Sequence, residues 1–244
     1  MSLLEHCVIP DWPAPKNVKA LQTTRNGGVS TVPYASLNLG GHVGDNPLSV
    51  SRNRMLLAPL LPSEPVWLKQ VHGTVVADAA QTTCWPEADA IVSSRPGAVC
   101  VVMTADCLPL LLCNEQGTIV AAVHAGWRGL CDGVIEQTVH AMHVLPQTLM
   151  AWLGPAIGPS AFEVGEEVRA AFTAGQREAA AAFVPGISGK WRADICQLAR
   201  LRLEALGITH IYGGGLCTYT DSARFFSYRR DGVTGRMGTF IWLE

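Results

Sequence analysis

Residues 99–129, VCVVMTADCLPLLLCNEQGTIVAAVHAGWRG, decide the fold of this chain. Two apolar runs flank the turn-forming tetrapeptide NEQG at residues 114–117, and this pattern predicts an antiparallel β-hairpin that is buried on at least one face. If Glu115 and Gln116 form a two-residue loop, Cys107 lies directly opposite His124. Opposed side chains of an antiparallel pair point to the same side of the sheet. The hairpin therefore predicts that a thiol and an imidazole lie side by side.

Two residues leave the register of this hairpin open. If Gly117 instead closes a three-residue loop with a bulge, the register shifts by one residue and the Cys107–His124 pairing becomes diagonal. Pro109 also indicates that the first strand is bent or lies at a sheet edge, because proline cannot donate to a ladder.

The composition favours a globular protein with a substantial core. The chain has 244 residues, a charged fraction of 16% and a net charge of −2, so no basic surface recommends a nucleic-acid partner. The apolar part of the hairpin is divided by Asp106, Pro109 and the NEQG turn, which argues against a membrane span. We expect a single domain over residues 1–244.

The eight cysteines point to a reducing compartment. None forms a Cys-x-x-Cys pair, and their spacing matches neither a zinc knuckle nor a disulfide framework. The N-terminus has no basic residue before its short apolar patch and does not read as a signal peptide. Reduced thiols in the cytoplasm are the expectation, most of them small buried hydrophobes.

The rest of the chain predicts a mixture of strands and helices in which most pairing is antiparallel. The long Gly/Pro/Ser/Asn-rich loop at residues 29–47 is of a kind that usually carries function. The predicted strands are 18–24, 66–76, 90–93, 149–153, 208–212 and 239–243, and the predicted helices are 46–60, 132–143, 163–183 with an interruption near Gly175, and 195–206.

Cys107 and His124, with one further imidazole, would form a Cys-His-His set. Three protein ligands with an open fourth position are typical of a catalytic zinc site. His72 is a candidate for the third ligand because it stands at a strand-to-turn junction, where a side chain can reach a cleft. The competing histidines are His6, His42 and His210.

The same residues permit other chemistries. Asp106, next to the thiol, could act as a general acid/base or orient a ligand, unless it leaves the sheet on the opposite face. A metal-free Cys107–His124 dyad would suit acyl or amide hydrolysis, and a set with Met103 would suit blue copper. A multicopper oxidase is excluded by counting, since the chain has seven histidines and no His-x-His pair. His140 and His143 are expected to be solvated surface residues.

Eight short motifs together resemble one known family. The chain resembles the laccase-domain family, also called the multicopper polyphenol oxidase family, whose members are regarded as purine nucleoside phosphorylases. The resemblance covers nearly the whole chain. It is closest to the enterobacterial-type members, which are described as peptidoglycan editing factors. The motifs are TRNGGVS (24–30), SLNL (36–39), GDNP (44–47), QVHG (70–73), TADC (104–107), HAGWRG (124–129), GPAIGP (154–159) and SYRR (227–230).

The resemblance implies a metal bound by His72, Cys107 and His124. It also implies an α/β sandwich of mixed sheets flanked by helices, similar to certain toxin-type cysteine hydrolases. Family members are credited with phosphorolysis of adenosine, inosine and methylthioadenosine, with adenosine deamination, and with a weaker copper-dependent phenol oxidation. The implied cofactor is Zn²⁺, with Cu²⁺ as the alternative.

The leading hypothesis is a cytoplasmic, zinc-dependent purine nucleoside phosphorylase with adenosine deaminase activity. We expect a monomer or homodimer that takes a purine nucleoside and phosphate. Arg128 is the first candidate for phosphate binding, because it stands where a tight turn enters a helix. The alternative, which uses the same Cys107, His124 and His72, is a cysteine or zinc amidohydrolase that removes misincorporated L-serine from a UDP-muramyl cell-wall precursor. Further candidates for substrate binding are Arg25, Asn38, Arg52 and Arg229.

Overall fold

The computed structural model describes residues 3–81 and 85–244, so that Cys84 lies outside the described residues. The stretch that organises the chain forms three strands, β5 (Cys100–Thr104), β6 (Leu108–Asn114) and β7 (Val120–Ala125). β6 and β7 form the predicted antiparallel hairpin, whereas β5 belongs to a different sheet. The chain changes sheets around Asp106, whose φ of 90° is rare for a residue with a side chain.

The described strands form three sheets. Their pairings are antiparallel except for β12 with β8 and β3 with β4, which confirms that most pairing is antiparallel. The four-stranded sheet has the spatial order β1 (Cys7–Val8), β2 (Val18–Thr23), β13 (Met237–Leu243) and β5. The six-stranded sheet has the order β12 (His210–Gly213), β8 (Leu149–Leu153), β6, β7, β4 (Ala90–Ser93) and β3 (Val76–Asp78). The small sheet consists of β10 (Phe183–Pro185), β11 (Trp191–Ala193) and β9 (Glu163–Val164).

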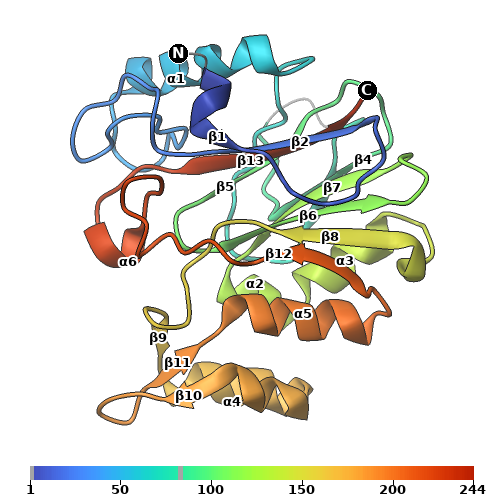
Figure 1. Ribbon diagram of the computed structural model, residues 1–244, viewed down its shortest axis with the longest axis vertical. Helices are drawn as coiled ribbons and strands as arrows, with labels where there is room; N and C mark the ends of the chain where they lie inside the picture. The colour runs from blue at the N-terminus through green and yellow to red at the C-terminus, as the bar shows by residue number, and fades with distance from the viewer. Residues whose placement is uncertain (1–2, 82–84) are drawn as a thin grey trace.

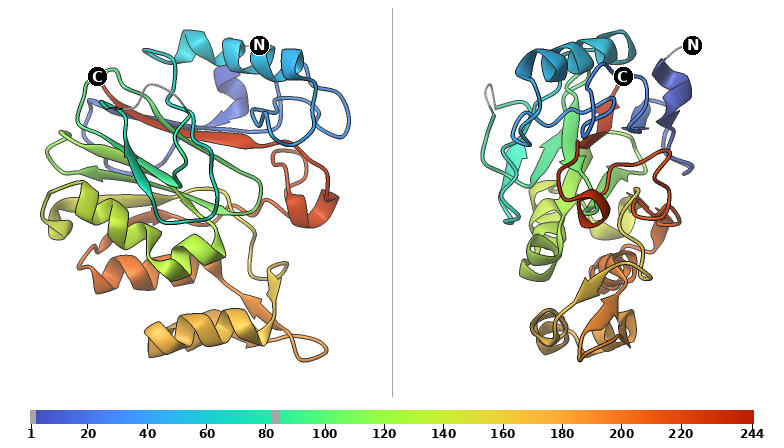
Figure 2. Two further views of the ribbon diagram at one scale, coloured as in Figure 1. Left: turned by 180° about the vertical axis from the view of Figure 1, so that it is seen from behind. Right: turned by 90° about the vertical axis from the view of Figure 1, so that its left-hand side faces the viewer.

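The two large sheets pack face to face, with helices on both outer sides (Figures 1 and 2). Side chains of β6 alternate, so that Leu111 and Cys113 enter the core between the sheets while Leu110 and Leu112 enter the core under the helices. Leu57 of α1 packs on the outer face of the four-stranded sheet. The α/β sandwich that the resemblance implied is therefore the observed fold, an α+β arrangement of mixed sheets flanked by helices.

The helices agree with the sequence where their caps are clear. Asn46 and Asp194 both accept a backbone hydrogen bond as N-caps, as their residue types favour. In the described part of the chain no helix is long and apolar enough to span a membrane. The α-helices are α1 (Pro47–Leu57), α2 (Trp127–Asp132), α3 (Val134–Ala141), α4 (Glu166–Gly175), α5 (Ile195–Ala205) and α6 (Tyr228–Asp231), and the 3₁₀ turns are Leu3–His6, Ala58–Leu60, Pro146–Thr148 and Arg177–Ala182.

Three predicted elements were wrong in extent. The helix predicted over residues 132–143 is split at Gly133, whose φ of 99° ends α2 before α3 begins. The helix predicted over residues 163–183 begins instead with strand β9, and its helical parts are α4 and a 3₁₀ turn. The predicted interruption near Gly175 is confirmed. The strand predicted over residues 66–76 forms only isolated bridges at Val66 and Lys69 before β3 begins.

The predicted register of the hairpin was also wrong. Pro109, not Cys107, is the partner of His124, and Cys107 precedes the first residue of β6. The loop is wider than two residues because the Asn114 side chain accepts the backbone amides of Thr118 and Ile119, at 2.8 and 3.2 Å. The slip amounts to two residues. Since side chains alternate with period 2, such a slip leaves the thiol and the imidazole on the same face.

Candidate active site

Three side chains from separate parts of the chain meet at one end of the hairpin. Cys107 lies just before β6, His124 lies near the end of β7, and His72 lies in the turn before β3. One ligand atom from each of them lies within 4.8 Å of the other two. The Cys107 Sγ is 3.7 Å from the His72 Nε2, and the two imidazole rings meet edge to face. The structure thus brings together the three residues predicted as metal ligands.

Two glycines let the beginning of α2 approach the His72 turn. A Cβ at Gly126 would lie 2.7 Å from the His72 ring and 3.2 Å from the Cys107 Sγ. A Cβ at Gly129 would lie 2.6 Å from the carbonyl oxygen of Gly73. Neither approach is compatible with a side chain unless neighbouring atoms shift, so the HAGWRG motif supplies space for the site.

Asp89 organises two of the three candidate ligands, and the sequence did not identify it. Its fully buried carboxylate accepts the His124 Nδ1–H at 2.7 Å. The same carboxylate accepts the backbone amides of Val71, His72 and Gly73 at 3.2, 2.9 and 2.7 Å. It therefore fixes the turn that carries His72 and leaves the His124 Nε2 facing the thiol. A carboxylate behind a ligating histidine is the usual arrangement at metal sites.

The donor set fits a tetrahedral zinc ion. With Zn–S near 2.3 Å and Zn–N near 2.0–2.1 Å, tetrahedral geometry places sulfur and nitrogen ligands about 3.6 Å apart. The observed separation of 3.7 Å between the Cys107 Sγ and the His72 Nε2 matches this value. Exposure increases from the buried His124 to the exposed His72, so a fourth position can face the solvent side. The three residues could hold one metal ion with an open position.

In the metal-free site, the surroundings of Cys107 favour its thiolate form and those of His124 its protonated form. Burial alone would raise the pKa of Cys107, but the charge of His124 and hydrogen bonds from His124 and His72 lower it to about 6. Burial would lower the pKa of His124, but the Cys107 thiolate and Asp89 raise it to about 9. Burial would raise the pKa of Asp89 as well, and its hydrogen bonds with His124, Gly73 and Val71 hold it below the usual value. A thiolate is the form that binds metal.

The trio lies in the wall of a cavity of about 380 Å³. Gln70 lines the cavity and is fixed by two hydrogen bonds with the backbone of Met103, at 2.7 and 2.8 Å. Arg236 is the cation of the cavity: only its Nη1 has hydrogen-bond partners among the described residues, the carbonyls of Thr234 and Gly235. Burial lowers the pKa of the Arg236 guanidinium, with Cys107 and Asp106 opposing this. His42, Thr104 and Tyr228 complete the polar lining.

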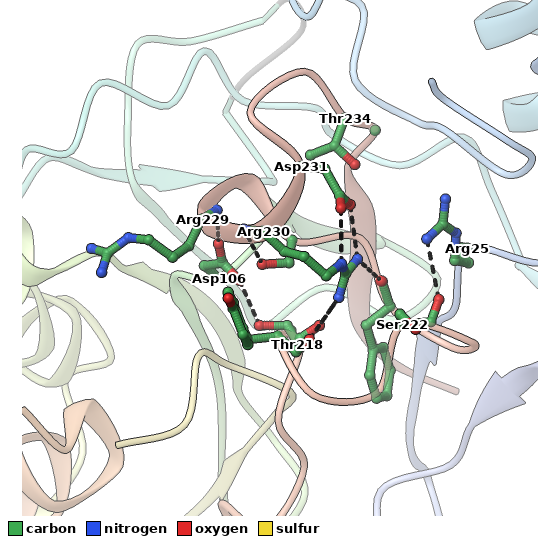
Figure 3. Close-up of polar contacts among 12 residues, drawn as sticks. Arg25, Asp106, Thr218, Ser222, Arg229, Arg230, Asp231 and Thr234 are labelled. Carbon is green, nitrogen blue, oxygen red and sulfur yellow. Dashed lines mark hydrogen bonds and ion pairs between the residues drawn. The ribbon is translucent and has the colours of Figure 1, made fainter. Parts of the chain in front are cut away.

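Asp106 ties α6 to the beginning of β6, as Figure 3 shows. One carboxylate oxygen accepts the hydroxyl of Thr218 at 2.7 Å, and the other accepts the backbone amide of Arg229 at 2.6 Å. These contacts place Tyr228, the first residue of α6, beside the cavity. The role of Asp106 as a general acid/base stays a prediction, and the structure shows it positioning α6.

The substrate-binding candidates lie in different surroundings. The guanidinium of Arg25 donates to the carbonyls of Ala35 and Ser222, and Figure 3 shows Arg25 beside Ser222. The guanidinium of Arg229 donates to the carbonyls of Ala161 and Glu163, so both arginines bind backbone. Arg128 lies over the Trp127 ring. The buried Asn38 hydrogen-bonds Asp45, Gly40 and the backbone of Arg236, and Arg52 is exposed on α1. Arg52, Arg128, Arg25 and Asn38 do not line the cavity that contains the trio.

Among the other histidines, only His42 lines the cavity, and it is not part of the ligand trio. His140 and His143 are exposed, as predicted. Asp89 and Arg236 are the residues that sequence reasoning missed. The signal for Asp89 was a carboxylate directly before a strand that is buried throughout, because a buried carboxylate needs partners. Arg236 stands in the TGR segment directly before the last strand and carried no such signal.

Comparisons with known proteins find a matching family and similar sequences. The family described as multi-copper polyphenol oxidoreductase laccase matches residues 19–244. The chain is 57% identical to "Purine nucleoside phosphorylase YfiH" of Escherichia coli (strain K12), over 97% of this chain and 98% of that protein. It is 55% identical to "Purine nucleoside phosphorylase PA4543" of Pseudomonas aeruginosa, over 96% and 97%.

A solved structure shares the fold. The crystal structure of the Neisseria meningitidis protein NMB0706 has a TM-score of 0.94 and 53% identity to this chain, and the match covers 98% of this chain and 99% of that one. Sequence, fold and the matched family together lead to one assignment: the chain belongs to the multi-copper polyphenol oxidoreductase laccase family.

Proposed function

We propose that the protein is a zinc-dependent purine nucleoside phosphorylase. The observation that carries the proposal is the meeting of a His-Cys-His trio with the incompletely paired Arg236 in one cavity. The names of relatives that are more than half identical to this chain support the reaction class. A zinc ion held by His72, Cys107 and His124 would supply Lewis-acid chemistry.

Other residues of the chain are suited to bind phosphate and to orient the metal ligands. Arg236, whose Nε and Nη2 have no hydrogen-bond partner among the described residues, is suited to hold a phosphate group by charge-assisted hydrogen bonds. Asp89 keeps the His124 ring in one orientation. In place of the arginines expected from the sequence, Arg236 therefore becomes the main candidate for phosphate binding.

Zinc is the ion of this proposal, because three protein ligands with an open fourth position are typical of catalytic zinc sites. Among the described residues, one group of three His, Cys, Asp or Glu side chains could hold an ion, and it combines two imidazoles with one thiolate. Adenosine deamination and a minor copper-dependent phenol oxidation at the same site belong to this proposal as secondary activities. So does a cytoplasmic location, which the free thiols of the described cysteines support.

The experiment is a product analysis with and without phosphate. Purified protein is incubated with adenosine, inosine or methylthioadenosine, and the free base and ribose 1-phosphate are separated by chromatography. We expect base release that depends on phosphate and yields one sugar 1-phosphate per base, which is ribose 1-phosphate from adenosine or inosine and 5-methylthioribose 1-phosphate from methylthioadenosine. Equal release without phosphate would contradict phosphorolysis, and hypoxanthine or inosine formed from adenosine would report deamination.

One observation favours a second candidate, a cysteine amidohydrolase. Cys107, His124 and Asp89 follow one another as nucleophile, base and orienting carboxylate, which is the arrangement of a catalytic triad. Such an enzyme could remove L-serine from a UDP-muramyl precursor. Release of serine from UDP-muramyl–L-serine by metal-free protein would support this candidate, whereas loss of all turnover on chelation would argue against it.

A further inference from the structure

A second cavity lies next to Cys107. It has a volume of about 180 Å³, less than half that of the cavity with Arg236. Ala105, Cys107 and Tyr228 line both cavities and therefore form the boundary between them. The side chains that line only the smaller cavity are Trp127 from α2, Ile157, Phe162, Ile195 from α5, Asp106 and Arg229.

The two cavities differ in chemistry. The larger one contains Arg236, His42 and the ligand trio. The smaller one is surrounded by the rings of Trp127, Phe162 and Tyr228 and by two isoleucines. Its charged groups are already engaged, because Arg229 donates to two backbone carbonyls and the carboxylate of Asp106 holds α6. The smaller cavity is thus suited to a flat, weakly polar ring.

The position of the boundary matters for a phosphorolysis reaction. As a phosphate oxygen forms its bond to C1′ of the ribose, the bond from C1′ to the base nitrogen breaks. The bonding electron pair leaves with the base, which takes up the proton that the hydrogen phosphate gives up. The entering phosphate and the departing base lie on opposite sides of C1′. Such a substrate needs an anion site and a ring site that meet at one point.

We propose that the smaller cavity binds the purine base, while the larger cavity binds phosphate and ribose. This inference rests on the proposed phosphorylase function and assigns its substrate orientation. Tyr228 lies at the junction, since it lines both cavities and its ring lies 5.9 Å from the guanidinium carbon of Arg236. Phe162 is the base-binding residue whose loss is easiest to interpret, because it lines the smaller cavity alone.

Phe162→Ala tests the assignment, with Phe183→Ala as its matched control. Both rings are 6% exposed and belong to the same hydrophobic core, but Phe183 does not line the smaller cavity. The probe is free adenine, measured as an inhibitor of inosine phosphorolysis. We expect its inhibition constant to rise roughly tenfold in Phe162→Ala, as for the loss of one aromatic contact to a base. The Phe183→Ala value should stay within about twofold of the wild type, and the KM for phosphate should be unchanged in both variants.

Three outcomes would overturn the assignment. One is an unchanged adenine inhibition constant in a folded Phe162→Ala protein. Another is an equal effect of the two alanine variants. A third is a selective loss of methylthioadenosine over adenosine, which would place the 5′ substituent in the cavity instead of the base.

A second measurement does not depend on turnover or on the folding of Phe162→Ala. Adenine should quench the part of the tryptophan fluorescence that Trp127→Phe removes, since the Trp127 ring lines the cavity. If the wild-type protein forms no ribose 1-phosphate but adenine still quenches Trp127, the phosphorylase proposal fails and the ring site stands. If adenine quenches nothing while ribose 1-phosphate is formed, the ring site fails and the phosphorylase proposal stands.

Discussion

The two ends of β6 carry cysteines with opposite properties. Cys113, near the end of the strand, is fully buried between the two large sheets, and burial raises its pKa to about 12. Cys107, just before the strand begins, has a pKa lowered to about 6 by His124 and His72 in spite of burial. Cys107 and Cys113 are six positions apart in the sequence, so the alternation of an extended chain would place both side chains on one face. The two pKa values differ because different segments of the chain lie beside the two ends of the strand.

At the Cys107 end, two other segments of the chain supply charge and hydrogen bonds. The His72 turn and the end of β7 meet there, and Asp89 connects them. At the Cys113 end, the neighbours are apolar residues of the adjacent strands β7 and β8, such as Val120 and Met150. The site therefore forms because the His72 turn and the end of β7 lie beside Cys107, and β6 alone would not form it.

The largest difference between the two ends is expected on removal of the thiols. Cys107→Ala should lose the metal and all phosphorolysis, because the thiolate is the one anionic ligand of the trio. The far-ultraviolet circular dichroism spectrum should stay native, since Cys107 precedes β6 and is not part of it. Turnover of inosine with phosphate measures the loss. Activity above one-tenth of the wild type would break the comparison.

Asp89→Asn tests the connection between the two segments. An asparagine oxygen can still accept backbone amides, but it no longer stabilises His124 by charge, so metal affinity should fall about 10- to 100-fold. Asp78→Asn is the control, because Asp78 also accepts a local backbone amide, from Ala80, but lies away from the trio. Competition with a chromogenic zinc chelator measures both. Equal affinities in the two variants would show that Asp89 has no role in the site.

Arg236→Gln sharpens the comparison on the substrate side. Loss of its charge-assisted hydrogen bonds should raise the KM for phosphate about tenfold and leave the zinc content unchanged. Arg52→Gln, on the exposed face of α1, should leave the KM for phosphate unchanged. The decisive outcome is the ratio of the two values. A larger effect of Arg52→Gln would return the phosphate site to the residues first suggested by the sequence.

The smallest effect is expected at the other end of β6. Cys113→Ala removes a buried sulfur from the core between the sheets, and the free energy of unfolding should fall by about 1 kcal/mol. Phosphorolysis and metal content should equal those of the wild type. Urea unfolding measures the stability. A loss of metal in this variant would mean that the two ends of the strand are not independent.

The sequence predicted the Cys107–His124 contact although its hairpin register was wrong. A slip of two residues preserves the face of the strand, so face was predictable where register was not. Register depended on the Asn114 side chain, which widens the loop by accepting two amides. The His72 turn entered as one of several candidates, and the family resemblance selected it.

Asp89 and Arg236 could not be assigned in the same way. Asp89 acts through contacts with residues 71–73 and His124, which are far from it in sequence and near it only after the sheets have formed. Arg236 reaches the cavity because Gly40, on a distant loop, has no Cβ, and such an atom would lie 2.8 Å from the Arg236 Cγ. The local sequence pattern predicts secondary-structure elements and the faces of strands, whereas the roles of Asp89 and Arg236 depend on tertiary contacts.

Elemental analysis of purified wild-type, Cys107→Ala and Cys113→Ala proteins tests the central claim most directly, namely that one metal ion is held where the chain crosses the beginning of β6. We predict about one zinc per chain in the wild type and in Cys113→Ala, and none in Cys107→Ala, as expected for a site with three protein ligands. Stoichiometric zinc in Cys107→Ala, or three or more coppers per wild-type chain, would contradict the claim.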